Sequence, residues 1–334
     1  MTEEEKGPVY APELAGGEWL QGDPLSIRDS GQPVLIDFWD YTCMNCLRTS
    51  PYVREWHRRY SEHGLRIIGV HTPEFTFARN SDHVKRAISE LAIDYPVVLD
   101  SELKIWSAYA NRYWPAKYFI NVEGKIQARH YGEGSYVESE QLIQALLSEQ
   151  EGFSATMPEV MSPIRDEDAA GAVCYRVTPE LYCGLTRGNI GNIANIAPDQ
   201  PSTYTDPGKH VEGMLYFEGD WILQTESAAR PYGARKTSRM HLDYMAADLN
   251  LVLHPPLTGE TAELRVFLDG KPIEDTAGTD VTSGKLSVDV PRMYNLVADT
   301  DVNRHTIVLE TDDDGLAAFA FTFTSCVAPA LEAS

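Results

Sequence analysis

Two cysteines three positions apart carry the clearest chemical signal in the sequence. Cys43 and Cys46 follow an apolar run at residues 34–39 and open a stretch, 47–60, with helical spacing of apolar residues. A thiol at a helix N-terminus meets unpaired amides and the positive end of the helix dipole, which favour the thiolate. A thiol one turn further along can attack a mixed disulfide and release the partner. We therefore predict that Cys43 is the nucleophile and Cys46 the resolving thiol.

One acid, Asp37, interrupts the apolar run six residues before Cys43. A carboxyl buried in an apolar strand has a raised pKa and could take the proton from Cys46. The alternative is a structural acid that is hydrogen-bonded at the strand end. For the cysteine pair, the alternatives are a structural disulfide or half of a zinc site. Zinc requires four ligands, and the sequence has no second pair at this spacing, so we expect no metal or organic cofactor beside the redox-active pair.

The surrounding elements indicate how these residues are positioned. Expected strands at 34–39, 65–70 and 95–99 alternate with expected helices at 47–60, 82–91 and 103–109, and a hairpin at 117–131 and a helix from 139 follow. This alternation predicts an α/β sheet with an antiparallel edge. We expect Pro51 to kink the first helix and Asp82 to cap the second.

The cysteine segment resembles the active-site segment of thioredoxin-fold proteins, in its apolar strand with a buried acid, in Cys43-Met44-Asn45-Cys46 and in Pro51. Residues 38–49, 69–75 and 112–118 are similar to TlpA/DipZ-type thiol-disulfide oxidoreductases. The resemblance implies a cis Pro115 that lies against the cysteines and presents backbone to the substrate chain, with Trp114 before it.

The same resemblance places Glu74 near the active site, although a solvated loop acid is the alternative. Trp39, Tyr41 and Trp114 could form an apolar collar around the sulfurs, or could be simple core. Because Met44-Asn45 differs from the Gly-Pro of thioredoxin, the direction of the reaction (reductant, oxidant or isomerase) stays open. Peroxiredoxins share the fold, and a thiol-dependent peroxidase is an alternative, although the Pro that precedes their peroxidatic Cys at set spacing is missing here.

Beyond residues 149–168 the pattern changes to short strand-like runs separated by turn signals, which is typical of a β-sandwich or jelly roll. We expect a thioredoxin-like domain at 1–150, a linker at 151–165 and an all-β domain at 166–334. This second part resembles the C-terminal domain of DipZ-type proteins, a jelly roll similar to carbohydrate-binding modules.

A sugar site in this domain would use exposed aromatic faces. The candidates are Trp221, Tyr232 and Tyr244, together with Tyr204 and Tyr294, and the alternative is that most of them are core. A glycan- or envelope-binding module with a vestigial redox domain is therefore the second functional hypothesis.

Three cysteines and one basic cluster in the second part remain. We expect Cys326 to be a free buried thiol, and Cys174 could bridge to Cys183 if their strands pair. The basic cluster is expected to be a solvated loop, with contact to an acidic ligand as the alternative; it comprises Arg230, Arg235, Lys236, Arg239 and His241.

Composition limits the class of partner. The chain has 334 residues, and 28 Lys and Arg against 50 Asp and Glu give a net charge of −22, which disfavours nucleic acid and anionic membrane. The expected partners are cysteine-containing client proteins and an upstream electron donor, either a CcdA-type membrane protein or a thioredoxin. No signal sequence or membrane span is apparent, which predicts a cytoplasmic protein if the chain stands alone, whereas the family resemblance implies the extracytoplasmic face.

Overall fold

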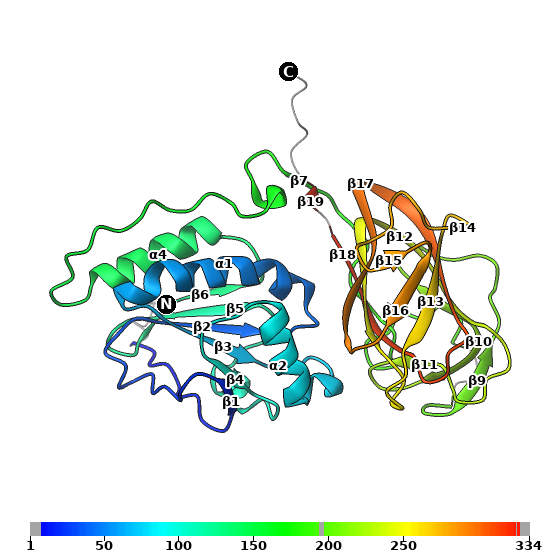
Figure 1. Ribbon diagram of the computed structural model, residues 1–334, viewed down its shortest axis with the longest axis horizontal. Helices are drawn as coiled ribbons and strands as arrows, with labels where there is room; N and C mark the ends of the chain where they lie inside the picture. Colours follow the sequence, from blue (N-terminus) through cyan, green and yellow to red (C-terminus); the bar gives the residue numbers. More distant parts are fainter. Residues whose placement is uncertain (1–7, 194–196, 325, 328–334) are drawn as a thin grey trace, which may run out of the picture. The chain divides into compact units, whose positions relative to one another are not determined.

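The computed structural model describes residues 8–193, 197–324 and 326–327. Its internal contacts divide the chain into two compact units, Met1–Ile164 and Arg165–Ser334, which are described separately below (Figure 1). In the described part of the chain, no helix has both the length and the apolar character needed to cross a membrane.

The first unit is built on a six-stranded sheet with the order β1-β4-β3-β2-β5-β6. Strands β2, β3 and β4 are parallel, while β1, β5 and β6 run antiparallel to their neighbours. The strands are β1 (Glu18–Gln21), β2 (Val34–Trp39), β3 (Arg66–His71), β4 (Val97–Leu99), β5 (Ala116–Ile120) and β6 (Ile126–Tyr131). The helices are α1 (Met44–Tyr60), α2 (Ser81–Glu90), α3 (Lys104–Ala108) and α4 (Tyr136–Ser148), with 3-10 turns at Ser61–His63 and Thr76–Arg79.

Both faces of this sheet are covered, which explains why its central strands are apolar throughout. On one face, Leu35 of β2 packs in a cluster with residues of α1, α2 and α4, among them Trp56 and Ile143. On the other face, Ile36 packs with Ile105 of α3 and with residues before β1. The sheet therefore holds the C-terminal end of β2 rigidly, at the point where the chain enters the cysteine segment.

Pro51 lies inside α1, and the kink expected there stays a prediction. One local detail of the first unit differs from the sequence prediction. The N-cap of α2 is Asn80, whose side chain accepts a hydrogen bond from the amide of Asp82, so Asp82 lies in the first turn and is not the cap. Asn and Asp cap equally well, so composition alone could not choose between them. Residues in the stretch expected as a linker also pack on this unit: the amide of Ile164 donates to the hydroxyl of Tyr52.

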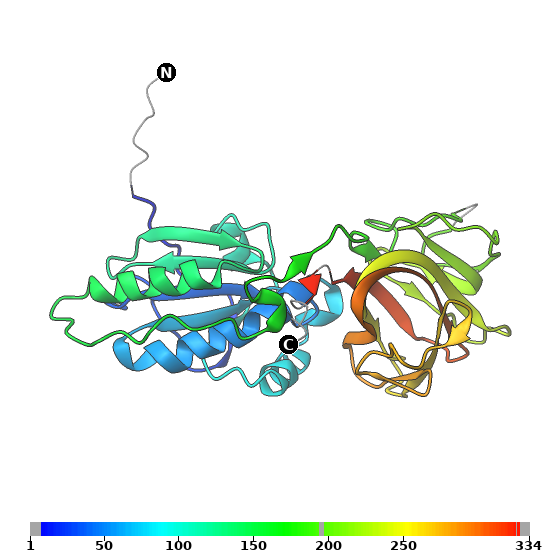
Figure 2. The same ribbon diagram turned by 90° about the horizontal axis from the view of Figure 1, so that it is seen from above.

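The second unit is a β-sandwich built from an eleven-stranded sheet (Figure 2). Its two long strands, β12 and β17, pair over most of their length. The other edge of β12 pairs with β10 over its first half and with β18 over its second half, so the sheet folds over on itself. One large hydrophobic cluster fills the interior.

The strands of this sheet are β8 (Leu181–Tyr182), β9 (Pro201–Tyr204), β10 (Leu215–Leu223), β11 (Ala228–Ala229), β12 (Ser238–His254), β13 (Ala262–Leu268), β14 (Lys271–Pro272), β15 (Val281–Thr282), β16 (Lys285–Val288), β17 (Arg292–Thr311) and β18 (Ala317–Phe323). A separate ribbon pairs β7 (Val173–Cys174) with β19 (Cys326–Val327), and a 3-10 turn at Asp166–Asp168 precedes it.

The cysteine pairing in this unit corrects the sequence prediction. Cys174 is joined to Cys326 and not to Cys183, because β7 and β19 pair with these two residues opposite each other. Cys183 is a free thiol with no exposed surface, so it is the small buried hydrophobe that had been expected at Cys326. The disulfide ties together two segments that are 152 residues apart in the sequence.

Candidate redox site

The two cysteines of the first unit occupy the first turn of α1. Cys43 is the N-cap residue, and its Sγ accepts a hydrogen bond from the amide of Cys46 at 3.3 Å. Cys43 is half-buried, whereas Cys46 is only 3% exposed. Cys43 therefore presents the accessible sulfur, in a position where helix amides stabilise a thiolate.

Cys46 is held as a thiol by its surroundings. Burial raises its pKa well above the ordinary value, and a hydrogen bond with Cys43 and the nearby charges of Cys43 and Asp37 add to the increase. A group that is slow to ionise cannot be the first nucleophile. The two thiols therefore differ in exposure, and Cys46 is the more buried of the pair.

A buried acid and a buried lysine lie close to Cys46. Asp37 on β2 faces Lys117 on β5 in the strand register, and Lys117 has no exposed surface. Burial raises the pKa of Asp37 to about 7, although the charge of Lys117 opposes the increase. Burial has the opposite effect on Lys117 and lowers its pKa, although the charges of Asp37 and Cys46 act to raise it.

The Asp37 carboxyl keeps one oxygen available. Its Oδ1 has no hydrogen-bond partner among the described residues, whereas Nζ of Lys117 donates to the carbonyl of Gly132 at 3.3 Å. A fully bonded structural acid would not show this arrangement. Lys117 was missed as part of the site in the sequence, although a lysine inside the apolar strand Ala116–Ile120 was a usable signal.

The aromatic residues pack with the cysteines at this end of the sheet. Trp39, Cys46 and Tyr41 belong to one cluster of buried side chains, and Cys43 and Trp114 pack against it. The indole of Trp114 donates to the carbonyl of Thr72 at 2.9 Å. The peptide bond between Trp114 and Pro115 is cis, as the family resemblance implied, and Pro115 is buried.

A second buried network fixes the loop that leads into α1. The side chain of Asp40 accepts hydrogen bonds from the amide of Thr42 at 2.8 Å and the amide of Glu74 at 2.5 Å, and Nε2 of His71 lies 3.6 Å away. Burial alone would raise the pKa of Asp40, but His71 and these amides outweigh it and lower the net pKa. Glu74 is half-buried beside this network and joins it through its main chain. No sequence pattern indicated a role for Asp40 or His71, and only the fold brings them together.

The aromatic candidates for a sugar site are not brought together. Trp221, Tyr244, Tyr204 and Tyr294 are buried in the sandwich interior, because inward-facing positions of these strands form its core. The indole of Trp221 already donates to the carbonyl of Glu218. Tyr232 is 60% exposed and stands alone of the five at the surface. The expectation of a glycan platform that includes Trp221 and Tyr244 is therefore wrong.

Only part of the basic cluster is the solvated loop that was expected. Arg235 and Lys236 are exposed in the loop before β12. Arg230, by contrast, is 3% exposed and forms an ion pair with Asp314. Arg239 bonds to Glu218 and Glu310 on the neighbouring strands. The charges of Arg230 and Arg239 are therefore paired within the sandwich.

Comparison with known proteins agrees with the two-unit architecture. Residues 13–129 match the AhpC/TSA family, and residues 178–324 match the family described as the thioredoxin like C-terminal domain. Protein DipZ of Mycobacterium bovis is 32% identical over 323 residues, which is 94% of this chain and 42% of DipZ. The chain is therefore similar to TlpA/DipZ-type proteins in both of its units. This DipZ-like chain spans less than half the length of the DipZ proteins that it matches.

Shorter relatives match the first unit of the DipZ-like chain. The thiol-disulfide oxidoreductase YkuV of Bacillus subtilis is 29% identical over 142 residues, 42% of this chain and 95% of YkuV. A thioredoxin-like protein solved in its oxidised form is 28% identical, with 43% of this chain and 98% of that chain covered and a TM-score of 0.39.

Proposed function

We propose that the DipZ-like chain is a thiol-disulfide oxidoreductase that exchanges the Cys43–Cys46 disulfide with cysteines of client proteins. The observation that carries this proposal is the asymmetry of the pair: a half-exposed Cys43 at the helix N-terminus and a buried Cys46 whose pKa burial raises, close to a carboxyl with an unbonded oxygen. The match to YkuV, which covers nearly all of that oxidoreductase, supports it.

The reaction proceeds by two thiol-disulfide exchanges. In the reducing direction, the Cys43 thiolate attacks one sulfur of a client disulfide, forms a mixed disulfide and releases the other client sulfur as a thiolate. Asp37 takes the proton of Cys46, whose thiolate then attacks Cys43 and releases the second client sulfur. Two electrons pass to the client, and the chain is left with the Cys43–Cys46 disulfide. The reverse sequence oxidises a client dithiol.

Asp37 suits this role because its pKa lies near neutral pH. A carboxyl with a pKa of about 7 can accept a proton and then release it to solvent near neutral pH. In the proposed reaction, Pro115 supplies backbone and Trp114 supplies apolar surface for binding of the client chain. Re-reduction after each cycle requires a donor, for which a CcdA-type membrane protein or a thioredoxin is proposed.

The proposed compartment is the extracytoplasmic face. The disulfide between Cys174 and Cys326 supports it, because structural disulfides persist mainly in oxidising compartments. For the second unit we propose no glycan site, since the aromatic faces that would form it are buried. We propose a jelly-roll topology for this unit, and this topology does not by itself indicate which ligand the unit binds.

Trapping of the mixed disulfide tests this function. In Cys46→Ala the resolving thiol is gone, so client proteins accumulate as disulfide-linked adducts at Cys43. Cys43→Ala traps none, and Cys183→Ala, which removes a buried thiol outside the site, behaves like the wild type. Non-reducing gel electrophoresis followed by reduction measures the adducts. Equal trapping by the Cys46 and Cys43 variants would contradict the assigned order.

A thiol peroxidase is the second candidate, and the match to the AhpC/TSA family is the observation that favours it. Peroxide consumption that depends on Cys43 and survives Cys46→Ala with a thiol reductant present would support the peroxidase. Loss of insulin-disulfide reduction in both cysteine variants, without peroxide turnover in the wild type, would support the oxidoreductase.

A further inference from the structure

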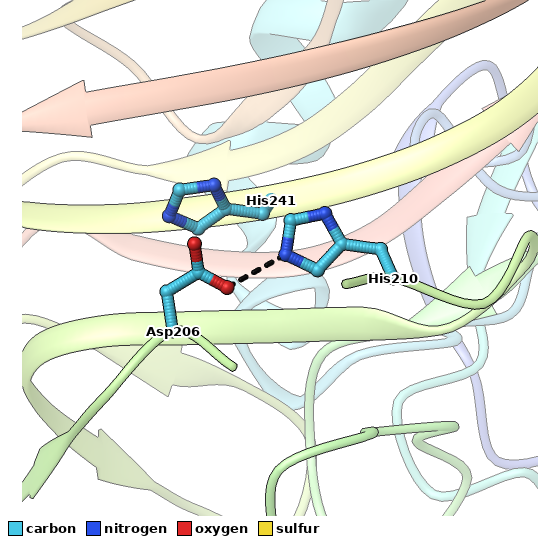
Figure 3. A group of neighbouring side chains, drawn as sticks. All are labelled: Asp206, His210 and His241. Carbon is cyan, nitrogen blue, oxygen red and sulfur yellow. Dashed lines mark hydrogen bonds and ion pairs between the residues drawn. The ribbon is translucent and has the colours of Figure 1, made fainter. Parts of the chain in front are cut away.

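Two histidines and an aspartate meet on the outer surface of the second unit (Figure 3). His241 lies on β12, and Asp206 and His210 lie in the loop between β9 and β10. Met240 and Leu242, which flank His241, face the sandwich core. Because side chains alternate across a strand, His241 points to the opposite face, where the loop covers it.

The three side chains converge closely. The Oδ1 of Asp206 lies 2.7 Å from Nε2 of His210, and the rings of His210 and His241 are 5.3 Å apart at their centroids. One donor atom from each residue lies within 4.8 Å of the other two. Donors bound to one zinc ion at about 2.1 Å are roughly 3.4 Å apart in a tetrahedron, so side-chain movements of about 1 Å would close the site.

The loop is already held in the geometry that this convergence needs. The amide of Gly208 donates to Oδ1 of Asp206, which closes a tight turn between Asp206 and His210. The amide of Val211 donates to the hydroxyl of Tyr216 on β10, and the His210 ring packs on the Tyr216 ring at 4.7 Å. The donors therefore do not have to be gathered from a flexible segment.

His210 also has a carboxylate near its other ring nitrogen, and a carboxylate lies beside the His241 ring. Nε2 of His241 lies 3.1 Å from Glu218, and Nδ1 of His210 lies 3.9 Å from Asp243. A carboxylate behind a metal-bound imidazole fixes its tautomer and raises its basicity, and this arrangement is common at metal centres. Asp243 is in turn held by the hydroxyl of Thr306 at 2.7 Å. The cluster thus has its outer partners in place.

The charge and the type of the donors select the ligand. Three carboxylates surround two imidazoles, which favours a cation. Two nitrogens and one oxygen suit Zn²⁺ and similar transition-metal ions, whereas Ca²⁺ and Mg²⁺ require mostly oxygen ligands. We propose that Asp206, His210 and His241 bind one divalent transition-metal ion of the zinc class, which joins the loop between β9 and β10 to β12. The donors are largely enclosed: His241 is buried, and Asp206 and His210 are half-buried.

Zinc titration of the full chain tests this site. The protein carries no polyhistidine tag and has Cys43→Ser and Cys46→Ser, so that the redox thiols cannot bind zinc. After chelator treatment, competition with a chromogenic chelator measures affinity and stoichiometry. We expect one equivalent of Zn²⁺ per chain, and an affinity at least tenfold lower in His210→Gln and in His241→Gln.

Two further variants keep the test decisive. Asp206→Asn changes a loop side chain outside the core and is expected to lower zinc affinity at least tenfold without unfolding the sandwich. His305→Gln is the matched control. His305 also pairs with an aspartate, at 2.8 Å from Asp269, but it is not part of the cluster of Asp206, His210 and His241. It should leave zinc affinity unchanged.

Spectroscopy gives an independent readout. Co²⁺ added in place of Zn²⁺ should produce visible absorption bands that disappear in His210→Gln and Asp206→Asn and persist in His305→Gln. The proposal is overturned if the chain binds no stoichiometric zinc, or if zinc affinity and the cobalt spectrum are the same in the variants of Asp206, His210 and His241 as in the control.

Discussion

Replacing Asp37 by Asn should change how the stability of the first unit depends on pH. The pKa of Asp37 is raised by burial from 3.8 to about 7 in the folded protein. Between these values the folded chain binds a proton that the unfolded chain has lost, so the free energy of unfolding decreases as the pH rises from about 4 to about 7. At about 1.4 kcal/mol per pH unit, the full decrease is about 4 kcal/mol.

The measurable part of this effect lies in an accessible range. From about pH 5 to about pH 8, the Asp37 contribution falls by about 2.5 kcal/mol in the wild type and is absent in Asp37→Asn. Without the Asp37 charge the pKa of Lys117 falls further, which adds a change of the same sign. The stability of the variant relative to the wild type should therefore increase by at least about 2.5 kcal/mol over this range.

Urea unfolding followed by tryptophan fluorescence measures this difference. Of the six tryptophans, all but Trp221 lie in the first unit, so the signal reports mainly on that unit. The cysteines are kept reduced throughout, and Asp23→Asn, an exposed acid in the same unit, is the control that should show no change. A stability difference between Asp37→Asn and the wild type that stays constant within about 0.5 kcal/mol from about pH 5 to about pH 8 would refute the buried-acid argument.

Three further predictions concern other parts of the chain. The double variant Cys174→Ser, Cys326→Ser opens a loop of 152 residues and should lower the unfolding free energy of the second unit by about 5 kcal/mol. Urea unfolding with and without reductant measures this loss, and an unchanged unfolding free energy would contradict the disulfide. Trp221→Ala leaves a cavity in the sandwich core and should lower the unfolding free energy by about 3–5 kcal/mol. Tyr232 is exposed, so Tyr232→Ala should lower it by less than about 0.5 kcal/mol. Equal decreases in the melting temperature of the two variants would contradict the assigned burial. Asp40→Asn should destabilise the first unit at neutral pH, and because the net pKa of Asp40 is lowered, the deficit should shrink as the pH falls below about 4, as checked by acid unfolding.

Local patterns were sufficient to predict the strand and the helix that carry the cysteine pair. An apolar strand that ends in a short loop and a Cys-x-x-Cys helix start places a sulfur at helix amides through short-range geometry alone, and the structure has β2 and α1 where the pattern predicts them. The resemblance added the cis peptide before Pro115, which no local rule specifies. Lys117 and the Asp40–His71 network escaped prediction, because their partners come from strands that are distant in the sequence.

In the second unit the sequence determined the type of structure but not which residues face outward. Runs of short strands indicated a sandwich, yet Trp221 and Tyr244 proved to be core, because the face that a strand buries depends on its neighbours in the sheet. Strand pairing likewise decided that Cys174 bonds to Cys326. The pairing of β10 with both β9 and β12 brought His241 to the loop that carries Asp206 and His210. The sequence by itself determined the cysteine pair at the start of a helix, which depends on residues three positions apart. The tertiary structure decided the disulfide, the buried acid's partner and the histidine cluster, because contacts between distant segments exist only after the sheets have formed.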